Sequence, residues 1–466
     1  MLNVRSKIYT CVALLFGLVI LSPIQAQATP SMVVSNAPHH IIILNESAPA
    51  LKKRVDMIRS AKGSIEIECW NFDLSRSSRI LLRELVARKK AVPSLGIRII
   101  LDYYVAGNLA QINPVVAQAL AGLGIQVRYY NQVPTADVID LNHRDHSKLF
   151  IVDGSEFIIG SRNLSDEHFG LGQGLNYIDT DFWVSGPIAR SVQTEFYEFW
   201  NSPIVRDPEG TFGYSKTKDL YSYDDKDRAL EENLEELGTA ALSASPVYQV
   251  NRLAFVKDGP LNEDSERKVT DYVDSKLARV NHSLLVENWG FIPDDSRLQI
   301  LDSLMAKGVK IELLTNGFDE HFSPTLSGMG WLSEAKEIPK GLSTSYYDSP
   351  LSEDHLDDAL AARHSVYETH SKTAVRDMRY VDVGSYNWDG RSAHINHEDL
   401  LTVDSPEIAQ VMTAVIQGRI ARSEKITADG KNQKGQSILP TSFQGAKLWA
   451  RELWLSLEED LIGDEF

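Results

Sequence analysis

Residues 146–163 read HSKLFIVDGSEFIIGSRN, and residues 370–387 read HSKTAVRDMRYVDVGSYN. In both copies an aspartate stands five residues after the lysine, and a Gly-Ser-x-Asn tetrapeptide begins seven residues after the aspartate. A single match to so short a pattern is weak support for a function. Two copies with identical offsets indicate instead that the chain is duplicated, and that each half carries part of one reactive site.

The residue types in these copies suit displacement at a phosphodiester. An imidazole can act as nucleophile or acid near neutral pH, and lysine is a compact cation suited to phosphate oxygens. Asparagine and serine add directed donors that stabilise developing charge. On a strand, His146 and Lys148 point to the same face, as do His370 and Lys372, because side-chain direction repeats every two residues. Two copies brought face to face would surround one phosphate, so no metal or other cofactor is required to neutralise its charge.

Simpler interpretations apply to several neighbouring residues. Asp153 and Asp377 fall on the opposite strand face from the lysines, which favours a role in bracing turns. Ser161 and Ser385 also fit simple turn positions. A further set of histidines is interpreted as solvated residues or loop contacts, namely His143, His168, His282, His364 and His394.

The duplication extends beyond these motifs. Residues 64–70 and 283–289 both read as strands that end in tryptophan. Each is followed by a helical stretch, at residues 78–90 and 296–307, and then by another strand, at residues 96–101 and 308–314. Strands that alternate with helices indicate α/β units around a mainly parallel or mixed sheet.

The duplicated signature resembles that of the phospholipase D superfamily, whose members carry two HKD motifs. Within the superfamily the chain is similar to the bacterial cardiolipin synthase and phosphatidyltransferase branch. The resemblance spans roughly residues 38 to 420 and is carried by residues 142–148, 153–154, 159–170, 179–181, 186–187, 384–387, 391–392 and 396–398. It implies two pseudo-symmetric phospholipase D-like α/β/α sandwich domains with mixed β-sheets, and an active site at their interface.

The resemblance also implies a two-step reaction through a phosphohistidine. By resemblance His146 is the nucleophile and His370 the general acid and base, although the pseudo-symmetry leaves the opposite assignment open. An acidic residue downstream of each motif orients its histidine in this family. Glu398 matches in the second half, whereas Asp179 and Asp181 compete in the first, and we prefer Asp179. The expected catalytic residues are His146, Lys148, Asn163, Asp179, His370, Lys372, Asn387 and Glu398, with Ser161 and Ser385 as substrate contacts.

Composition patterns divide the chain into five segments. Residues 1–28 resemble a cleaved secretion signal, with a basic start, an apolar stretch and a small-x-small end, so we expect a periplasmic or secreted protein. An N-terminal phospholipase D-like domain at residues 29–212 and a C-terminal one at residues 248–422 flank an acidic connector at residues 213–247. The tail at residues 423–466 contains an amphipathic pattern that favours a helix closing against the body over one that lies on a membrane surface.

Three further features are predicted within these segments. Residues 227–237 should form an amphipathic connector helix. The loop at residues 256–260 resembles one that opens the family's second half, and we assign it a contact with substrate. Residues 319–366 form a long insertion rich in Ser, Gly and Asp, and its length predicts either a lid over the site mouth or a poorly ordered segment.

Charge and cysteine content limit the partners. The net charge is −17, and about −19 once the signal is removed, which disfavours a nucleic-acid partner because such binding depends on neutralising backbone phosphates. The expected partners are a phospholipid substrate, an acceptor water or alcohol, and a membrane surface contacted transiently. Of the two cysteines, only Cys69 lies outside the signal, so no internal disulfide can form and a buried, inert thiol is expected.

The sequence therefore favours a phosphodiesterase or phosphatidyltransferase of phospholipids, of phospholipase D or cardiolipin synthase type. Hydrolysis and transfer share one site, because the outcome depends on whether water or an alcohol reaches the intermediate. The alternatives are a nuclease of the same superfamily and a catalytically inert binding scaffold.

Overall fold

The computed structural model describes residues 32–106, 111–132, 143–209, 222–260, 267–316, 343–347, 366–426 and 434–435 of the 466-residue chain. The predicted signal, the tail helix and most of the proposed lid lie outside these residues. Within the proposed lid, residues 343–347 are described and form strand β16 (Ser343–Tyr347), which pairs in parallel with β15 (Lys310–Asn316). This part of the insertion therefore belongs to a sheet, which corrects the prediction of a lid there.

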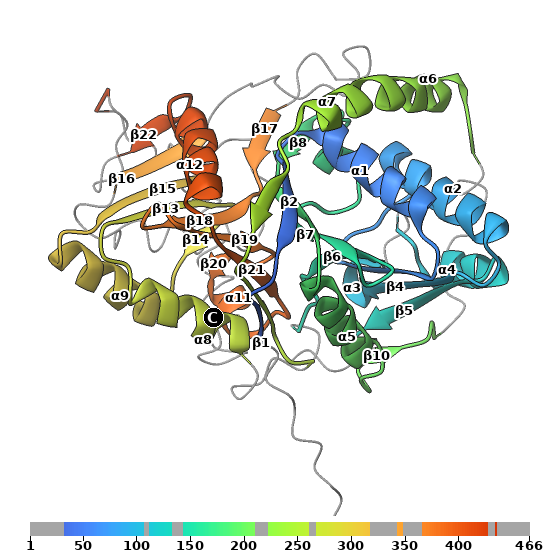
Figure 1. Cartoon of the computed structure of the whole chain (residues 1–466), viewed down its shortest axis with the longest axis horizontal. Coiled ribbons are helices and arrows are strands. Elements are labelled where there is room, and N and C mark those ends of the chain that lie inside the picture. Colours follow the sequence, from blue (N-terminus) through green and yellow to red (C-terminus); the bar gives the residue numbers. More distant parts are fainter. Residues whose placement is uncertain are drawn as a thin grey trace, which may run out of the picture. The chain divides into compact units, whose positions relative to one another are not determined.

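Two nine-stranded mixed sheets form the framework (Figure 1). The first has the order β10-β5-β4-β3-β6-β7-β9-β2-β11. Its strands are β2 (His39–Leu44), β3 (Ser64–Cys69), β4 (Gly96–Asp102), β5 (Ile125–Tyr130), β6 (Lys148–Val152), β7 (Glu156–Gly160), β9 (Asp181–Ser185), β10 (Val205–Arg206) and β11 (Tyr248–Val250). The pairs β3–β4 and β4–β5 are parallel, and β3–β6 and β6–β7 are antiparallel.

The second sheet has the order β1-β12-β21-β19-β18-β13-β15-β16-β22. Its remaining strands are β1 (Met32–Ser35), β12 (Leu253–Lys257), β13 (Ser283–Asn288), β18 (Lys372–Arg376), β19 (Tyr380–Gly384), β21 (Asp399–Asp404) and β22 (Glu424–Ile426). Read in reverse, this order matches the first sheet strand for strand. The outermost strands are exchanged, because β1 precedes the first half but pairs with β12, and β11 follows that half but pairs with β2.

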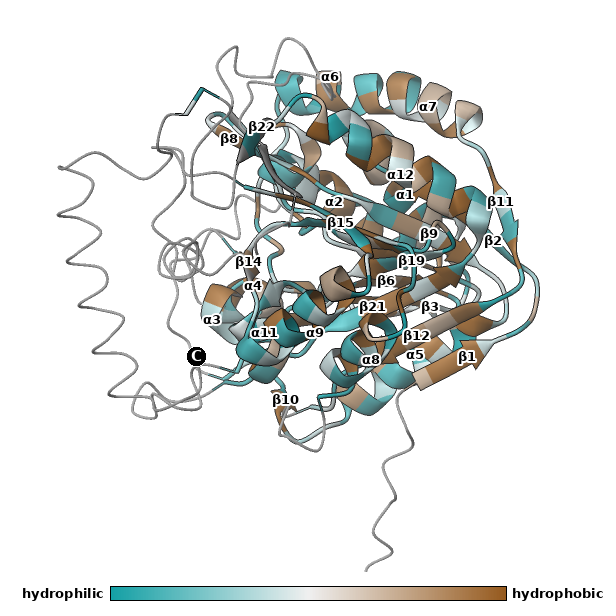
Figure 2. Ribbon diagram, turned by 90° about the vertical axis from the view of Figure 1, so that its left-hand side faces the viewer, coloured by the Kyte–Doolittle hydropathy of each residue, from teal (hydrophilic) through white to brown (hydrophobic). Residues whose placement is uncertain are grey.

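Helices cover the sheets because each presents one apolar face. The first hydrophobic cluster unites the first sheet with α1 (Ser47–Ser60), α2 (Arg76–Ala91) and α4 (Pro114–Gly122). The opposite face of that sheet joins a second cluster, which includes α5 (Ile188–Trp200), α12 (Pro406–Ile420) and strands of the second sheet. A third cluster unites the second sheet with α8 (Lys268–Leu277) and α9 (Asp295–Ala306). Figure 2 shows the resulting pattern of brown strands inside and helices with one teal and one brown face.

The predicted connector helix is present and longer than the sequence indicated. It comprises α6 (Asp225–Asn233), a π-helical turn over residues 234–238 and α7 (Thr239–Ala244). Leu230 and Leu234 are fully or almost fully buried in the first cluster, and this burial explains why the acidic segment is ordered. No helix among the described residues has the length and apolarity needed to cross a membrane.

Candidate active site

Both histidine motifs lie where a strand begins. His146 stands two residues before Lys148, the first residue of β6, and His370 stands in the same relation to Lys372 at the start of β18. Each lysine ammonium donates a hydrogen bond to the carbonyl of its own histidine, at 2.6 Å in the first half and 2.7 Å in the second. The two half-sites therefore share one local geometry.

A short parallel ribbon between the halves positions His370. Strand β8 (Leu175–Ile178) pairs in parallel with β17 (Val366–Thr369), with Ile178 opposite Thr369. The next residues in the two strands, Asp179 and His370, are therefore neighbours. The His370 amide donates to the Ile178 carbonyl at 2.7 Å, and Nδ1 of His370 lies 2.8 Å from Oδ1 of Asp179.

A matching bridge positions His146. Asp145 and His397 form an isolated parallel β-bridge, and the His146 amide donates to the His397 carbonyl at 2.9 Å. Nδ1 of His146 then lies 3.0 Å from Oε1 of Glu398. Each carboxylate thus holds the histidine of the opposite half, which corrects the expectation that it orients the histidine of its own motif. The physical reason is that both ribbons run between the halves, so the next residue on each strand meets its counterpart across the interface.

The carboxylates decide which nitrogen of each catalytic imidazole can react. Because Nδ1 of each imidazole faces a carboxylate, Nε2 is the atom left to meet a substrate. A tryptophan packs edge-on against each ring, with centroids 5.9 Å apart for Trp70 and His146 and 6.1 Å apart for Trp289 and His370. The side chains of His146 and His370 are 12% and 10% exposed, so both rings are almost enclosed.

The electrostatics of the two half-sites are coupled. Burial lowers the pKa of His146 well below its usual value, and the cations Lys148 and Lys372 lower it further. Burial and Lys372 likewise lower the pKa of His370 well below its usual value, whereas Asp179 opposes this shift. Burial, with the nearby charge of Lys148, also lowers the pKa of Lys372 well below its usual range. Lys372 therefore acts on both histidines, which indicates that the two motifs converge on one location.

The predicted asparagines and serines have different surroundings. Asn163 and Asn387 are each 5% exposed, and their amide oxygens make no hydrogen bond among the described residues. The hydroxyls of Ser161 and Ser385 are fully buried and donate to Asp179, at 2.6 Å, and to Glu398. The structure thus assigns these serines to holding the carboxylates, in place of the predicted contact with substrate.

The other motif aspartates are accounted for by local bonds. The carboxylate of Asp153 accepts from the amides of residues 62–64, and that of Asp377 from the amides of residues 281–283. This confirms that both brace turns. Asp181, the competitor of Asp179, instead pairs with the buried guanidinium groups of Arg54 at 2.9 Å and Arg162 at 2.8 Å.

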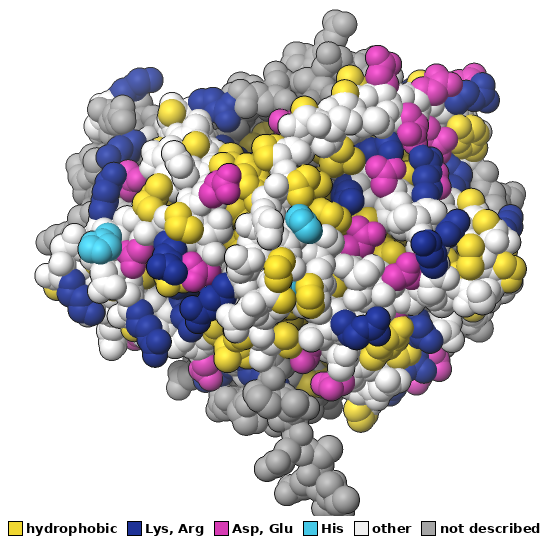
Figure 3. Space-filling model, in the orientation of Figure 1, with side chains coloured by type: hydrophobic (Ala, Val, Ile, Leu, Met, Phe, Trp, Pro, Cys, Tyr) yellow, Lys and Arg dark blue, Asp and Glu magenta, His cyan; other side chains and the backbone are white. Residues whose placement is uncertain are grey.

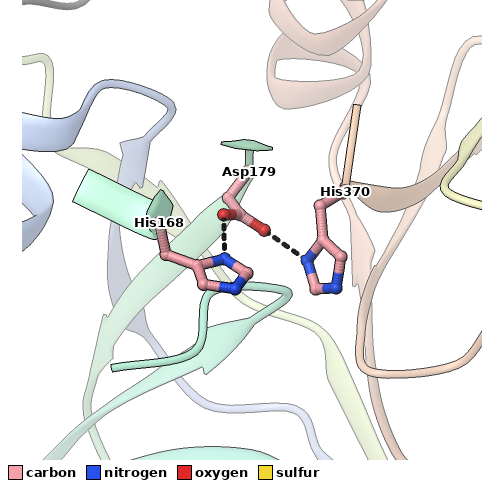
Figure 4. Close-up of side chains that lie close together, drawn as sticks. All are labelled: His168, Asp179 and His370. Atoms are coloured by element: carbon pink, nitrogen blue, oxygen red, sulfur yellow. Dashed lines mark hydrogen bonds and ion pairs between the residues drawn. The ribbon is translucent and has the colours of Figure 1, made fainter. Parts of the chain in front are cut away.

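One residue of the site was misinterpreted from the sequence. His168 is buried, not solvated, and its Nδ1 lies 2.8 Å from Oδ2 of Asp179, so that one carboxylate holds two imidazoles (Figure 4). Figure 4 shows the His168 and His370 rings on either side of that carboxylate. One feature of the sequence could have pointed to a role for His168 in the site. His168 stands five residues after Asn163, and Ser392 stands five residues after Asn387.

A group of buried charged residues surrounds the ion pair of Lys257 and Glu68. The ammonium of Lys257, in the loop predicted to touch substrate, is 1% exposed and bonds both carboxylate oxygens of Glu68. That prediction is therefore wrong for Lys257, which is buried away from any substrate. Near this pair, burial raises the pKa of Asp145 well above its usual value and that of Asp399 to about 7.

Two groups of described residues have the composition of a metal site. They are His168, Asp179 and His370, and Glu68, Asp145 and His397, in which the candidate ligand atoms lie within 4.8 Å of one another. In the first group both Nδ1 atoms already hydrogen-bond to Asp179. In the second the Lys257 ammonium already neutralises Glu68. Hydrogen bonds and ion pairs thus account for both arrangements.

Comparison with known families identifies this arrangement. The family model described as "Cardiolipin synthase, PLD-like domain" matches residues 55–200 and, a second time, residues 275–420. The chain belongs to this phospholipase D-like family. The duplication and the predicted superfamily are thereby confirmed, and each matched region contains one histidine motif.

Individual relatives of this phospholipase D-like chain support the family assignment. Cardiolipin synthase C of Escherichia coli is 24% identical over 400 residues, which cover 79% of this chain and 82% of the relative. An uncharacterized protein of Helicobacter pylori is 24% identical over 405 residues, covering 80% and 78%. The crystal structure of phosphatidylserine synthase from Haemophilus influenzae superposes with a TM-score of 0.63 at 13% identity, covering 91% of this chain and 94% of the other. The last match shows the fold alone, and the predicted α/β class with two phospholipase D-like domains is confirmed.

Proposed function

We propose that this protein transfers or hydrolyses the phosphatidyl group of phospholipids through a phosphohistidine intermediate. The observation that carries the proposal is the crossed pairing of two histidines with two carboxylates, which commits both Nδ1 atoms to carboxylates in one enclosed, lysine-rich site. A carboxylate on Nδ1 fixes the tautomer and stabilises the imidazolium when it forms.

In the first step, Nε2 of His146 attacks phosphorus and forms a P–N bond. The P–O bond to the leaving alcohol breaks, and His370 gives its Nε2 proton to the departing oxygen. In the second step, Nε2 of His370 takes the proton of an incoming hydroxyl, whose oxygen attacks phosphorus as the P–N bond breaks. Lys148, Lys372 and the amides of the two motif asparagines would hold the equatorial oxygens.

Electrostatics favour His146 as the nucleophile. Burial and both site lysines lower its pKa, which favours an unprotonated, nucleophilic Nε2. Burial and Lys372 also lower the pKa of His370, but Asp179 opposes this shift. A bound phosphodiester, which brings negative charge, would raise the pKa of His370 towards its usual value and so favour the proton that the leaving group needs.

Several observations favour a phospholipid over a nucleic acid. Relatives of this chain include proteins named cardiolipin synthase, in Escherichia coli and Staphylococcus aureus. The net charge of −17 opposes binding to an extended phosphate backbone. Figure 3 shows acidic and basic side chains interspersed over the face in view, without the continuous basic surface that such a backbone requires. We further propose that the protein works in the periplasm or outside the cell, where it contacts a membrane surface transiently and takes water or an alcohol as acceptor.

Product analysis tests this proposal. Purified protein would be incubated with vesicles containing phosphatidylglycerol, with EDTA present, and the lipids analysed by mass spectrometry with and without added glycerol. Cardiolipin as product supports transfer between lipids, and phosphatidic acid supports hydrolysis. Cleavage of single-stranded DNA or bis-nitrophenyl phosphate without any change in lipid would replace the proposal with a nuclease. Lack of turnover on all three substrates would favour the inert scaffold.

A further inference from the structure

The two half-sites differ at one position that contacts a catalytic carboxylate. The positions five residues after Asn163 and Asn387 hold His168 and Ser392, respectively. Both side chains bind the carboxylate downstream of their own motif. His168 uses Nδ1 at 2.8 Å from Asp179, and the Ser392 hydroxyl donates to Glu398 at 2.6 Å.

The hydrogen bonds of His168 define its tautomer. Its Nδ1 faces a carboxylate, which only accepts hydrogen bonds, so this nitrogen carries a proton. Its Nε2 lies 3.1 Å from Nδ2 of Asn163, whose amide donates. His168 therefore connects the carboxylate that orients His370 with the amide proposed to hold the phosphate.

The ring of His168 is fixed in place. Its side chain is 4% exposed, it stacks on Tyr177 with centroids 4.7 Å apart, and it meets the His370 ring edge-on at 4.8 Å. A residue packed this closely cannot reach a substrate while it keeps its bonds. Any effect of His168 on the reaction must therefore pass through Asp179, Asn163 or the His370 ring.

The two positions share a structural task but differ in chemistry. The Ser392 hydroxyl also accepts from the backbone N–H of Asn387 at 3.2 Å, so it too links the asparagine segment with the carboxylate. A hydroxyl stays neutral throughout the working pH range, whereas an imidazole can become charged. Among the described residues, the carboxylate of the His370 half-site thus holds a second imidazole, whereas that of the His146 half-site holds a hydroxyl in its place.

We propose that His168 is a positioning residue that shares the Asp179 carboxylate with His370 and thereby weakens the proton affinity of His370. The inference rests on the proposed function, because it concerns the acid and base of that reaction. A hydrogen bond from His168 withdraws negative charge from Asp179, and less charge remains to stabilise a protonated His370. Protonated His370 would then be a stronger acid towards the leaving oxygen than it would be with Asp179 to itself.

Other titratable groups around the two rings contribute to this balance. Burial lowers the pKa of His370, Lys372 from β18 lowers it further, and Asp179 raises it. Tyr177 from β8 packs on both rings. Glu167, Glu368 and Asp179 act on Tyr177 by raising its pKa, after the larger effect of its burial. All of these groups stay unchanged when residue 168 alone is replaced.

The test is the pH–rate profile of His168→Ala, which removes the hydrogen bond to Asp179. Turnover would be measured on phosphatidylglycerol vesicles from pH 5 to pH 9, with His282→Ala, an exposed histidine outside the site, as the matched control. We expect the alkaline limb of kcat in His168→Ala to move to higher pH by roughly 0.5 unit or more, because His370 then holds its proton more tightly. KM should stay within about two-fold, since uniform binding of the lipid is untouched.

A second variant separates the two contacts of His168. In His168→Asn the side-chain amide keeps a donor for Asp179, so the alkaline limb should stay near that of wild type, whereas loss of the bond to Asn163 should lower kcat by roughly ten-fold. A wild-type pH profile in folded His168→Ala would overturn the inference while leaving the proposed function intact. An inactive wild-type protein would overturn the proposed function itself. Should His168→Ala not fold, the same shift is expected in His168→Leu, which also lacks a donor, and its absence there would overturn the inference.

Discussion

The Glu398 carboxylate lies 3.0 Å from Nδ1 of His146, although 252 residues separate the two in the chain. The reciprocal pair, His370 and Asp179, is 2.8 Å apart. The two halves are therefore interdependent, because neither can orient its own histidine without the carboxylate of the other. This crossing gives a physical reason for keeping both copies of the duplicated unit in one chain.

Replacing Glu398 by Gln should impair His146 specifically. The amide keeps the shape but removes the charge that stabilises the imidazolium, so we expect kcat to fall by roughly 10²- to 10⁴-fold. Histidine NMR of the folded variant should show a larger change in the titration of His146 than of His370. A larger change at His370 would contradict the crossed pairing.

Asp179→Asn and Asp181→Asn should produce different defects. Asp179 faces His370, so its replacement should lower kcat by roughly 10²-fold or more while the fold persists. Asp181 holds Arg54 and Arg162, so its replacement leaves buried charge unpaired and should cost about 3–5 kcal/mol of unfolding free energy. Urea unfolding and steady-state kinetics on both variants check this, and equal defects in stability would count against the assignment.

Lys257→Met should destabilise the protein because Glu68 loses its buried partner. The expected loss is about 3–5 kcal/mol, and the double variant with Glu68→Gln should recover part of it. The surface pair of Arg379 and Asp404 offers a matched control, because the Arg379 side chain is 54% exposed and Arg379→Ala should destabilise the protein far less than Lys257→Met. Comparable losses in the two single variants would contradict the buried network.

Asp399→Asn should change how stability depends on pH. Burial raises the pKa of Asp399 from 3.8 to about 7, so the native protein keeps a proton that the unfolded chain releases between those values. The stability that this proton contributes is complete below about pH 3.8 and is lost as pH rises through 7. Asparagine does not titrate, so the unfolding free energy of the variant relative to wild type should rise by about 1–3 kcal/mol between pH 5 and pH 8. Urea unfolding at both pH values measures this difference, and a constant difference would refute the proposed titration.

Local patterns were sufficient to predict the framework. Strands β3 and β13 and the helices that follow them show clear periodicity, and the same order in both halves indicated two α/β units. The reactive residues were predictable for the same reason, since His146 and His370 stand in a short repeated motif. The exchange of β1 and β11 was not predictable, because three- and four-residue strands carry no signal for the sheet they join.

The connections across the site were harder to predict. The crossing of Asp179 and Glu398 depends on a four-residue parallel ribbon and one isolated bridge, neither of which leaves a periodic pattern. A histidine after a polar turn resembles a solvated residue, so the burial of His168 became clear only from its packing on Tyr177. The sequence indicated a role for His168 only through its position, five residues after the motif asparagine, which Ser392 shares in the second half.

The most direct test of the central claim is the covalent intermediate. Protein turning over phosphatidylglycerol would be quenched within the first turnovers, digested, and analysed by mass spectrometry under conditions that preserve phosphohistidine. We predict a phosphatidyl adduct on the peptide that contains His146, accumulating in His370→Ala if the first step still proceeds, and no adduct in His146→Ala. Full turnover by His146→Ala, or an adduct confined to a residue outside the two motifs, would contradict the account.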